Sequence, residues 1–280
     1  MGKLFLVATP IGNLDDISYR ALKILESVSV IAAEDTRHTL KLLNHYQIKK
    51  PLVSFYDHNE NLRIPLILEA LQQGDVALVS DGGTPALNDP GYDLVNAVIQ
   101  AGFSVSPIPG PCAPIAALIT SGLPTHQFLY LGFLPRQKNA RTKSLKNIVQ
   151  YPFTLLFLEA PHRLTQTLID MLEAFGDRRI VIAREMTKIH EEFYRGNISE
   201  AIAHYQESAP RGEITLVVEG VQKKTEIWDD DKINTIIIKN LEAKKSVKDI
   251  TNELSPQVGL PKKQLYQRIN QLIAQSQKSK

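Results

Sequence analysis

The chain of 280 residues contains a single cysteine, Cys112, and cannot form a disulfide within itself. Chains without disulfides are typical of reducing compartments. The seven histidines are not spaced as metal ligands and no second thiol is present, so the sequence predicts no metal site. No stretch approaches the roughly 20 apolar residues of a membrane helix, and the first apolar run breaks at Pro10, too early for a signal peptide. We therefore expect a soluble cytoplasmic protein without a membrane span.

Two widespread nucleotide-binding signatures are also missing. The turn after the first apolar run reads ATPIGNLDD, residues 8–16, and contains neither G-x-G-x-x-G nor the GK[ST] of a phosphate-binding loop. This disfavours a nicotinamide-binding fold and a P-loop NTPase. A Gly/Pro turn at the carboxyl end of a strand can still bring main chain toward a ligand in an open α/β sheet. Taken alone, however, such a turn more often only connects two secondary-structure elements.

The charge is distributed unevenly along the chain. The formal net charge is only +2, yet residues 223–280 hold twelve Lys and Arg against seven Asp and Glu, while residues 1–222 hold 20 against 23. A basic tail on a nearly neutral body is typical of a protein with a polyanionic partner. On charge alone, a tail kept basic for solubility explains the pattern equally well.

Short apolar runs alternate with helical patterns through most of the chain, which predicts an α/β fold. The runs near residues 4–9, 28–34, 51–56, 75–81 and 104–109 barely alternate, which is typical of parallel strands buried on both faces. A second α/β series follows Gly and Pro residues near 121–127. We predict three parts, namely an α/β domain over residues 1–121, a second over 122–221, and a small basic helical extension over 222–280.

A loop rich in glycine and proline, SDGGTPALNDPG, follows the fourth predicted strand at residues 80–91. Such a loop can hold a small polar ligand through main-chain hydrogen bonds. Asp81 and Asp89 add acceptors that suit an amine or a ribose. The alternative is a long structural connection, but twelve residues are many for that purpose in a compact α/β domain. A shorter turn, PGPCA at residues 109–113, follows the fifth strand and is a weaker signal.

The segment EDTRHT, residues 34–39, follows the second predicted strand, where catalytic side chains of α/β sheets collect. Asp35 is expected to cap the next helix, with the following residues in its first turn. That assignment leaves Glu34, Arg37 and His38 for a ligand.

The second α/β region has charged strand ends at 159–163 and 183–188 that suit an anionic substrate or a salt-bridged rim. A run without acids between residues 136 and 146 suits RNA phosphate contacts or an exposed helix face; its basic members are Arg136, Lys138, Arg141, Lys143 and Lys146.

Together these stretches resemble the tetrapyrrole methylase superfamily, and within it the branch of ribosomal RNA small subunit (cytidine-2′-O)-methyltransferases. The resemblance covers residues 3–220, and it rests on VATPIGNLDDISYRAL, IAAEDTRHT, SDGGTPALNDPG, PGPCA, GFLPR, LEAPHRL, AREMTKIHEE and RGEITLVVEG. EDTRHT, EAPHR and AREMTK separate this branch from its cobalamin-pathway relatives. Gly82 replaces an alanine of the family pattern, and Asn88 and Cys112 each replace a serine.

The resemblance implies two α/β domains with S-adenosylmethionine bound in the cleft between them, and a homodimer that acts on 16S RNA of the small ribosomal subunit at a cytidine ribose in the decoding region. The predicted cofactor-binding residues are Pro10, Gly12, Asp81, Gly82, Gly83, Thr84, Pro85, Asp89, Pro90, Gly91, Gly110, Pro111, Ala113, Glu213 and Ile214. The predicted RNA-binding residues are His38, Arg136, Lys138, Arg141, Arg163 and Arg184.

The expected reaction is attack of a ribose 2′-oxygen on the sulfonium methyl group. Because that hydroxyl is a weak acid, a base or a positive field assists the transition state. We predict Glu34 as the base and Arg37 and Lys188 as stabilisers of the developing alkoxide, meeting at one end of the cleft. Two alternatives remain open, a methyltransferase for small tetrapyrroles and a non-catalytic module that binds RNA or the ribosome on a methylase scaffold.

Overall fold

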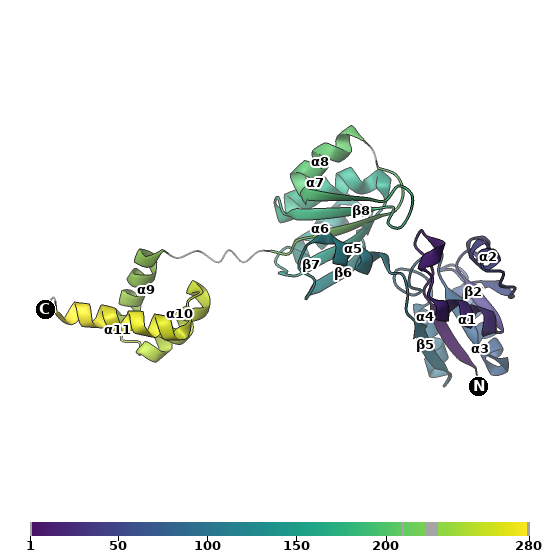
Figure 1. Ribbon diagram of the computed structural model, residues 1–280, viewed down its shortest axis with the longest axis horizontal. Coiled ribbons are helices and arrows are strands. Elements are labelled where there is room, and N and C mark those ends of the chain that lie inside the picture. The colour runs from purple at the N-terminus through teal and green to yellow at the C-terminus, as the bar shows by residue number, and fades with distance from the viewer. Residues whose placement is uncertain (1, 209, 222–228, 279–280) are drawn as a thin grey trace. The chain divides into compact units, whose positions relative to one another are not determined.

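The computed structural model describes residues 2–208, 210–221 and 229–278. The chain divides into two compact units, Met1–Val221 and Gln222–Lys280 (Figure 1). The larger unit contains two five-stranded sheets, each with its own helices.

The first sheet has the strand order β3-β2-β4-β1-β5, and all its described pairings are parallel. Its strands are β1 (Lys3–Val7), β2 (Val30–Ala33), β3 (Leu52–Ser54), β4 (Val76–Val79) and β5 (Ser104–Ile108). Between them lie a 3-10 turn η1 (Leu14–Asp16) and the helices α1 (Tyr19–Ser27), α2 (Thr36–His45), α3 (Glu60–Gln73) and α4 (Tyr92–Gln100). The predicted strand and helix runs are thus confirmed, and each connection crosses over through a helix as a parallel sheet requires.

Both faces of this sheet are buried, as the non-alternating strands predicted. Val7 and Val79 face one core with Leu25 of α1 and Leu43 of α2. The neighbouring strand positions face a second core with side chains of α3 and α4, whose buried members include Leu4, Leu78, Ile67, Leu71, Leu94 and Val98. Helix starts follow the local sequence: the Ser18 hydroxyl accepts the N–H of Ala21, and Asp35 caps α2 as predicted.

The second sheet has the order β6-β7-β10-β8-β9 and is mixed. Its strands are β6 (Phe128–Phe133), β7 (Thr154–Glu159), β8 (Arg179–Arg184), β9 (Glu192–Asn197) and β10 (Ile214–Val218). Only β6 and β7 run parallel, and β10 is antiparallel to both β7 and β8. The sequence did not predict β9, because this edge strand, EFYRGN, has no fully buried residue and so carries no apolar signal.

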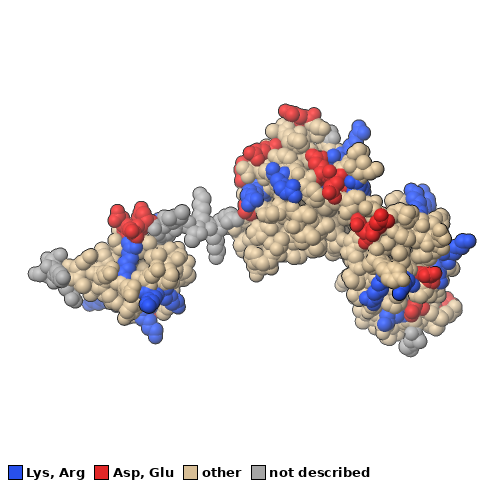
Figure 2. Space-filling model, viewed as in Figure 1, with Lys and Arg blue, Asp and Glu red and all other residues tan. Residues whose placement is uncertain are grey.

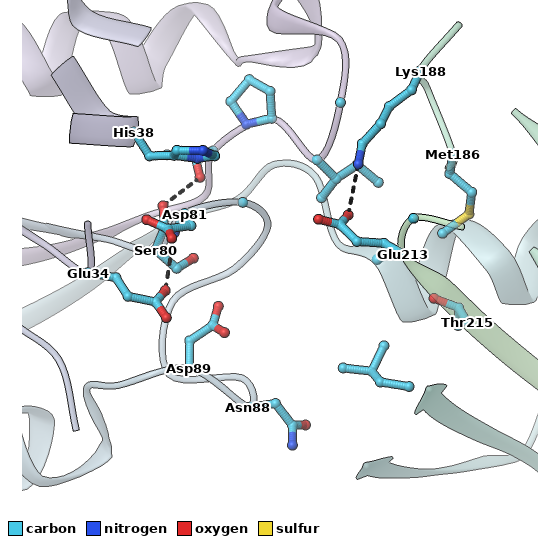
Figure 3. A pocket seen from close by; sticks show the side chains of 18 of the residues that line it. Glu34, His38, Ser80, Asp81, Asn88, Asp89, Met186, Lys188, Glu213 and Thr215 are labelled. Atoms are coloured by element: carbon cyan, nitrogen blue, oxygen red, sulfur yellow. Dashed lines mark hydrogen bonds and ion pairs between the residues drawn. The ribbon is translucent and has the colours of Figure 1, made fainter. Parts of the chain in front are cut away.

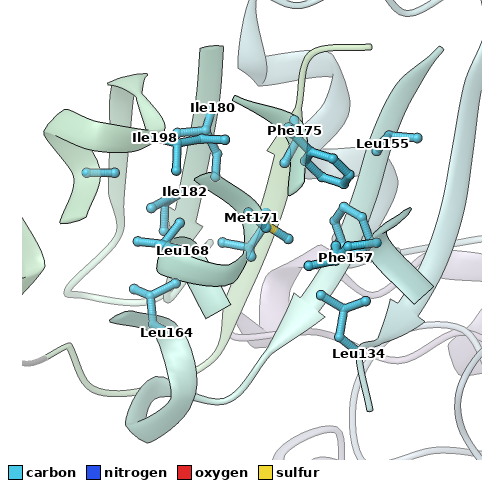
Figure 4. Close-up of a cluster of buried hydrophobic side chains, with 14 of the residues drawn as sticks. Leu134, Leu155, Phe157, Leu164, Leu168, Met171, Phe175, Ile180, Ile182 and Ile198 are labelled. Carbon is cyan, nitrogen blue, oxygen red and sulfur yellow. The ribbon is translucent and has the colours of Figure 1, made fainter. Parts of the chain in front are cut away.

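Helices α6 (Lys138–Ile148), α7 (Leu164–Phe175, preceded by the turn η2, Pro161–Arg163) and α8 (Ile198–Glu207) cover one face of the second sheet. There Leu168 and Met171 of α7 pack against Phe157 and Ile182 of the strands (Figure 4). This core is the largest group of buried apolar side chains among the described residues.

The other face of the second sheet is covered by α5 (Ala113–Ser121). Ala117 and Leu118 of this helix pack on Leu156, Val181 and Val217. The predicted boundary at 121/122 assigned this helix to the first domain, so the boundary differs from the packing. The reason is that α5 is mostly apolar and buries its surface against the second sheet, whereas Gly122 and Pro124 only mark where the helix ends.

The smaller unit contains α9 (Asp230–Glu242), α10 (Val247–Val258) and α11 (Lys262–Lys278) around their own apolar core. Gly259 ends α10 with a φ of 69°, which glycine adopts at little cost. These helices agree with the helical extension predicted over residues 222–280, of which residues 222–228 lie outside the described part of the chain. No helix among the described residues is long and apolar enough to cross a membrane.

One predicted RNA contact is wrong. Arg141 on α6 is only 4% exposed and forms an ion pair with Asp170 of α7, with 2.6 Å between Nη2 and Oδ2. Its Nη1 also donates to the main-chain oxygens of Pro135 and Arg136. The basic run from residue 136 predicted an exposed residue at position 141. Helical periodicity instead turns Arg141 inward, toward a buried carboxylate that is distant in sequence.

We expect Arg141→Ala to lower the free energy of unfolding by about 3–5 kcal/mol, because it leaves the buried carboxylate of Asp170 without its cationic partner and with only the hydrogen bond from Gln166 among its described contacts. Urea and thermal unfolding measure this change. The exposed neighbour Arg136 is the matched control, and Arg136→Ala should shift stability by less than about 0.5 kcal/mol. Equal stability of the two variants would contradict the assignment of Arg141 to the core.

Candidate functional site

A cavity of about 740 Å³ lies within the larger unit and is lined by residues of both α/β domains. The first domain contributes the segments that follow β1, β2 and β4, as expected for ligand sites at the carboxyl ends of parallel strands. The second contributes the end of β7, the turn after β8 and the start of β10. Figure 3 shows acidic side chains of the first domain on one side and Lys188 and Glu213 on the other.

Main-chain contacts fix the loop of residues 81–91. Thr9 and Gly83 exchange two main-chain hydrogen bonds, at 2.8 and 2.9 Å. The Thr84 hydroxyl donates to the main-chain oxygen of Pro111 at 3.1 Å. At the far end, the N–H of Gly91 donates to the Glu60 carboxylate at 2.9 Å. The loop is therefore a fixed part of the cavity wall.

Three carboxylates form an acidic wall, namely Glu34, Asp81 and Asp89. Oε2 of Glu34 accepts the main-chain N–H of Asp81 at 3.2 Å, and Oδ1 of Asp81 accepts the main-chain N–H of Asp35 at 3.0 Å. This exchange ties the end of β2 to the end of β4. Burial raises the pKa of Glu34, and it raises the pKa of Asp89 to about 6, to which the nearby charge of Asp81 contributes.

The opposite wall carries a cation. The Nζ of Lys188 lies 2.9 Å from Oε1 of Glu185 and 3.3 Å from Oε2 of Glu213. Burial alone would lower the pKa of Lys188, but these two carboxylates outweigh burial and raise it. Lys188 therefore remains protonated at neutral pH, as a fixed positive charge.

The two walls meet where Gly12 packs against the turn after β8. A Cβ at position 12 would lie 2.5 Å from Cγ of Lys188 and 2.8 Å from the main-chain oxygen of Met186, so only glycine fits without displacement. Beside it, the N–H of Asn13 donates to the Thr187 hydroxyl at 3.0 Å. This contact joins the first domain to the second at the edge of the cavity.

The structure brings eight of the fifteen predicted cofactor residues to the cavity wall, namely Pro10, Gly12, Asp81, Gly82, Asp89, Ala113, Glu213 and Ile214. The other seven are not among the described residues that line the cavity, namely Gly83, Thr84, Pro85, Pro90, Gly91, Gly110 and Pro111. Several of these seven support the wall from behind. Gly83 has a φ of 92° and pairs with Thr9, so a branched side chain at position 83 would strain the loop itself.

Of the three predicted catalytic residues, Glu34 and Lys188 line the cavity. Arg37 is not among the described lining residues; 86% of its side chain is exposed, and it pairs with Asp35 at 2.6 Å. The structure thus brings two of the three to one cavity, on opposite walls, and leaves Arg37 on the surface beside it, so the three do not meet at one end (Figure 3). The catalytic roles of Glu34 and Lys188 stay predictions, whereas the exposure of Arg37 argues against the role predicted for it.

The predicted RNA-binding residues are placed differently from one another. His38 lines the cavity, and Arg136 and Lys138 are exposed. Arg163 pairs with Glu159 at 3.2 Å and donates to the main-chain oxygen of Leu134 at 2.8 Å. Arg184 pairs with Glu192 at 2.7 Å. Both of these arginines already have protein partners.

Sequence reasoning missed several lining residues. Thr39, Lys41 and Leu42 of α2 extend the cavity beyond His38, because positions one turn apart on a helix share a face. That spacing was the available signal. Phe133 and Leu158 also line the cavity, and only the apolar character of β6 and β7 marked them.

The residues around the cavity fit S-adenosylmethionine. The acidic wall suits the sulfonium and ammonium cations of the cofactor, and Ile11 and Ile214 offer apolar surface for its adenine. The Thr39 hydroxyl is buried and has no hydrogen-bond partner among the described residues, so it is available to a ligand. The cavity volume lies within the range of small-molecule sites, about 300–1,000 Å³. The described residues contain no cluster of metal-ligating side chains.

Comparison with known proteins identifies the family of the chain. Residues 3–202 match the family described as Tetrapyrrole (Corrin/Porphyrin) Methylases. The chain is 52% identical over 221 residues to Ribosomal RNA small subunit methyltransferase I of Thermotoga maritima, covering 79% of this chain and 99% of that protein. It is 44% identical over 274 residues to the protein of the same name from Halalkalibacterium halodurans, covering 95% and 93%.

Solved structures support the same fold. The crystal structure of the methyltransferase CobJ superposes with a TM-score of 0.60 at 18% identity, covering 79% of this chain and 95% of that chain. The chain therefore belongs to the tetrapyrrole methylase family and, within it, to the group of ribosomal RNA small subunit methyltransferase I proteins.

Proposed function

We propose that this protein transfers the methyl group of S-adenosylmethionine to a cytidine ribose in 16S RNA of the small ribosomal subunit. The observation that carries the proposal is the match of 95% of the chain to a protein named Ribosomal RNA small subunit methyltransferase I. The cavity supports it with an acidic wall for a cationic donor and with the ammonium N–H donors of Lys188 for a developing oxyanion. We further propose that the methyl group is added to the 2′-oxygen of a cytidine in the decoding region, and that the protein is a cytoplasmic homodimer.

The cofactor, when bound, supplies an electrophilic methyl group on a sulfonium. The protein contributes position and field. Glu34, Asp81 and Asp89 place negative charge where the cationic donor binds, and burial makes that charge more effective than it would be in water. The tie between Glu34 and Asp81 holds these carboxylates in place before any ligand arrives, which lowers the cost of ordering them.

The ribose hydroxyl must lose a proton as it attacks. Glu34 is suited to accept it, because the contact described for its carboxylate, from the N–H of Asp81, engages Oε2 and because its raised pKa makes it a stronger base than an ordinary carboxylate. Lys188 can stabilise the developing oxyanion. Its ammonium has three N–H donors, and the described contacts to Glu185 and Glu213 use two of them.

Label transfer tests this proposal. Purified protein with methyl-labelled S-adenosylmethionine should modify assembled small subunits, and ribose methylation mapped in 16S RNA should fall on one cytidine. Free RNA and a porphyrinoid are the competing acceptors. Transfer to the porphyrinoid alone would instead favour the small-molecule methyltransferase. Cofactor binding without transfer to any acceptor would favour a non-catalytic module.

We expect Lys188→Ala to lower turnover by roughly 10²-fold, as is typical for the loss of an electrostatic stabiliser. Glu34→Gln should lower it to a similar extent by removing the base. Arg37 is the matched control, since it is exposed and lies outside the described cavity lining, so Arg37→Ala should stay within about threefold of the parent enzyme. Single-turnover kinetics on small subunits measure these rates. Parent-like turnover in both Lys188→Ala and Glu34→Gln would contradict the assigned roles.

The raised pKa of Asp89 predicts a pH dependence of cofactor affinity. Because this pKa is about 6 in the folded protein, Asp89 is largely neutral below pH 6 and negative above it. Affinity for the cation should therefore rise with pH and reach a plateau above pH 7, and it should be about tenfold weaker at pH 5 than on that plateau. Calorimetric titration from pH 5 to 8 measures this, and Asp89→Asn should flatten the profile. An unchanged profile in that variant would assign the titration to another group.

The exposed basic residues Arg136 and Lys138 should contact RNA phosphates. We expect the double change Arg136→Gln and Lys138→Gln to weaken binding of small subunits. It should also reduce the magnitude of the slope of log affinity against log salt by roughly 1–2, because fewer phosphate contacts release fewer counterions. Lys49 and Lys50 precede the amino end of β3, away from the carboxyl ends that form the cavity, and neutralising them serves as the control. Equal slopes in both double variants would show that the run is only a solvated helix face.

A further inference from the structure

Phe133, the last residue of β6, lines the cavity while 53% of its surface is exposed. A single exposed phenylalanine is common on protein surfaces and needs no function. The main chain that places this ring is the informative feature. Three features of the main chain around Phe133 place its ring at the cavity wall instead of in the adjacent core.

The first is a β-bulge in β6. Tyr130 is paired with Leu156 and Phe133 with Leu158, so two residues of β6 lie opposite one residue of β7. Side chains alternate between faces along a strand, so an extra residue reverses the alternation that follows. Leu134 consequently enters the core under α7, at 5% exposed, and Phe133 turns to the cavity face. Without the bulge these two side chains would exchange faces.

The second contact fixes the bulge against the loop of residues 81–91. Gly132 has a φ of 60°, and a Cβ there would lie 2.4 Å from Nδ2 of Asn88. The third contact fixes the following residues, because Arg163 donates to the main-chain oxygen of Leu134 at 2.8 Å and Arg141 donates to those of Pro135 and Arg136. Arg141 and Arg163, two of the four arginines predicted as RNA contacts, thus hold the main chain next to Phe133.

We propose that Phe133 is the platform on which the base of the target nucleotide stacks, so that it selects a nucleotide that has left the RNA helix. This inference rests on the proposed function and adds how the substrate is held. Because the site lies in a cavity, a nucleotide must enter it in a single-stranded or extruded state, and an aromatic face replaces the stacking that such a base loses. Phe133 offers a fixed aromatic face at the cavity wall, beside Leu158.

Kinetics on small subunits test the platform. Phe133→Ala should reduce kcat/KM by roughly 10–100-fold, mainly through KM, because aromatic–base stacking contributes that much to RNA binding. Phe133→Tyr should retain activity, whereas Phe133→Leu, which keeps apolar bulk without an aromatic face, should lose it. Phe128 begins the same strand at 41% exposed and is not among the described lining residues, so Phe128→Ala is the matched control and should behave as the parent enzyme.

Fluorescence gives a second readout that does not depend on methyl transfer. Phe133→Trp and Phe128→Trp are made with Trp228, the sole tryptophan of the chain, changed to Phe. Small subunits should quench the tryptophan at position 133 and leave that at position 128 unchanged. Calorimetry with S-adenosylmethionine should give the same affinity for Phe133→Ala as for the parent enzyme.

Several outcomes would overturn the platform. They are full activity in Phe133→Leu, unchanged kcat/KM in Phe133→Ala, equal loss in Phe128→Ala, or loss of cofactor affinity in Phe133→Ala, which would assign the ring to the cofactor. An active parent enzyme combined with any of these refutes only the stacking role. A parent enzyme that methylates no ribosomal RNA refutes the proposed function instead, and quenching at position 133 then still reports whether RNA reaches the ring.

Discussion

The cavity depends on one close approach between the two α/β domains, the packing of Gly12 against the turn after β8. At this point atoms of Met186, Thr187 and Lys188 in the second domain leave no room for a Cβ on Gly12, and Asn13 adds a hydrogen bond to Thr187. The turn itself is unusual, since Glu185 and Thr187 have φ values of 50° and 65°, in a region that non-glycine residues rarely adopt. Such strain persists only where surrounding contacts determine the conformation, and it concentrates at functional sites. The same turn carries Lys188, so the contact that joins the domains also positions the cation of the site.

Charge in the cavity is separated between its two walls. The acidic wall holds Glu34 and Asp89, whose raised pKa values show that burial disfavours their charged forms. A cationic ligand would relieve that cost, which gives the site a preference for positive charge before any specific contact is made. Lys188 on the opposite wall does not cancel this preference, because Glu185 and Glu213 already neutralise much of its field. The site can therefore bind a cation on one side and present N–H donors to a second reactant on the other.

Much of the fold could be predicted from sequence. Burial on both faces of the first sheet removes the alternation of apolar and polar residues from its strands, and such continuous apolar runs can be recognised in the sequence. The glycine-rich loop and the ends of β2 and β8 were likewise predictable as a site, since strand ends gather ligands. Three features could not be predicted. The edge strand β9 has no buried residue, α5 packs on the sheet that follows it, and Arg141 finds a buried partner 29 positions away. Each is decided by tertiary contacts that leave no local pattern.

The cavity and the C-terminal helices belong to different compact units of the chain. All the described residues that line the cavity belong to the larger unit, Met1–Val221. The Thermotoga maritima relative is matched over 99% of its length by 221 residues of this chain, so that protein is about as long as the larger unit alone. The C-terminal unit has its own apolar core, and Figure 2 shows acidic side chains at its upper edge with basic ones directly beneath them and along its lower edge. Arg268 pairs with Asp230 and Lys245 with Glu253, so part of the basic charge of this unit is neutralised within it. Among the described residues, the contacts that set the geometry at Gly12, Glu34 and Lys188 all come from the larger unit.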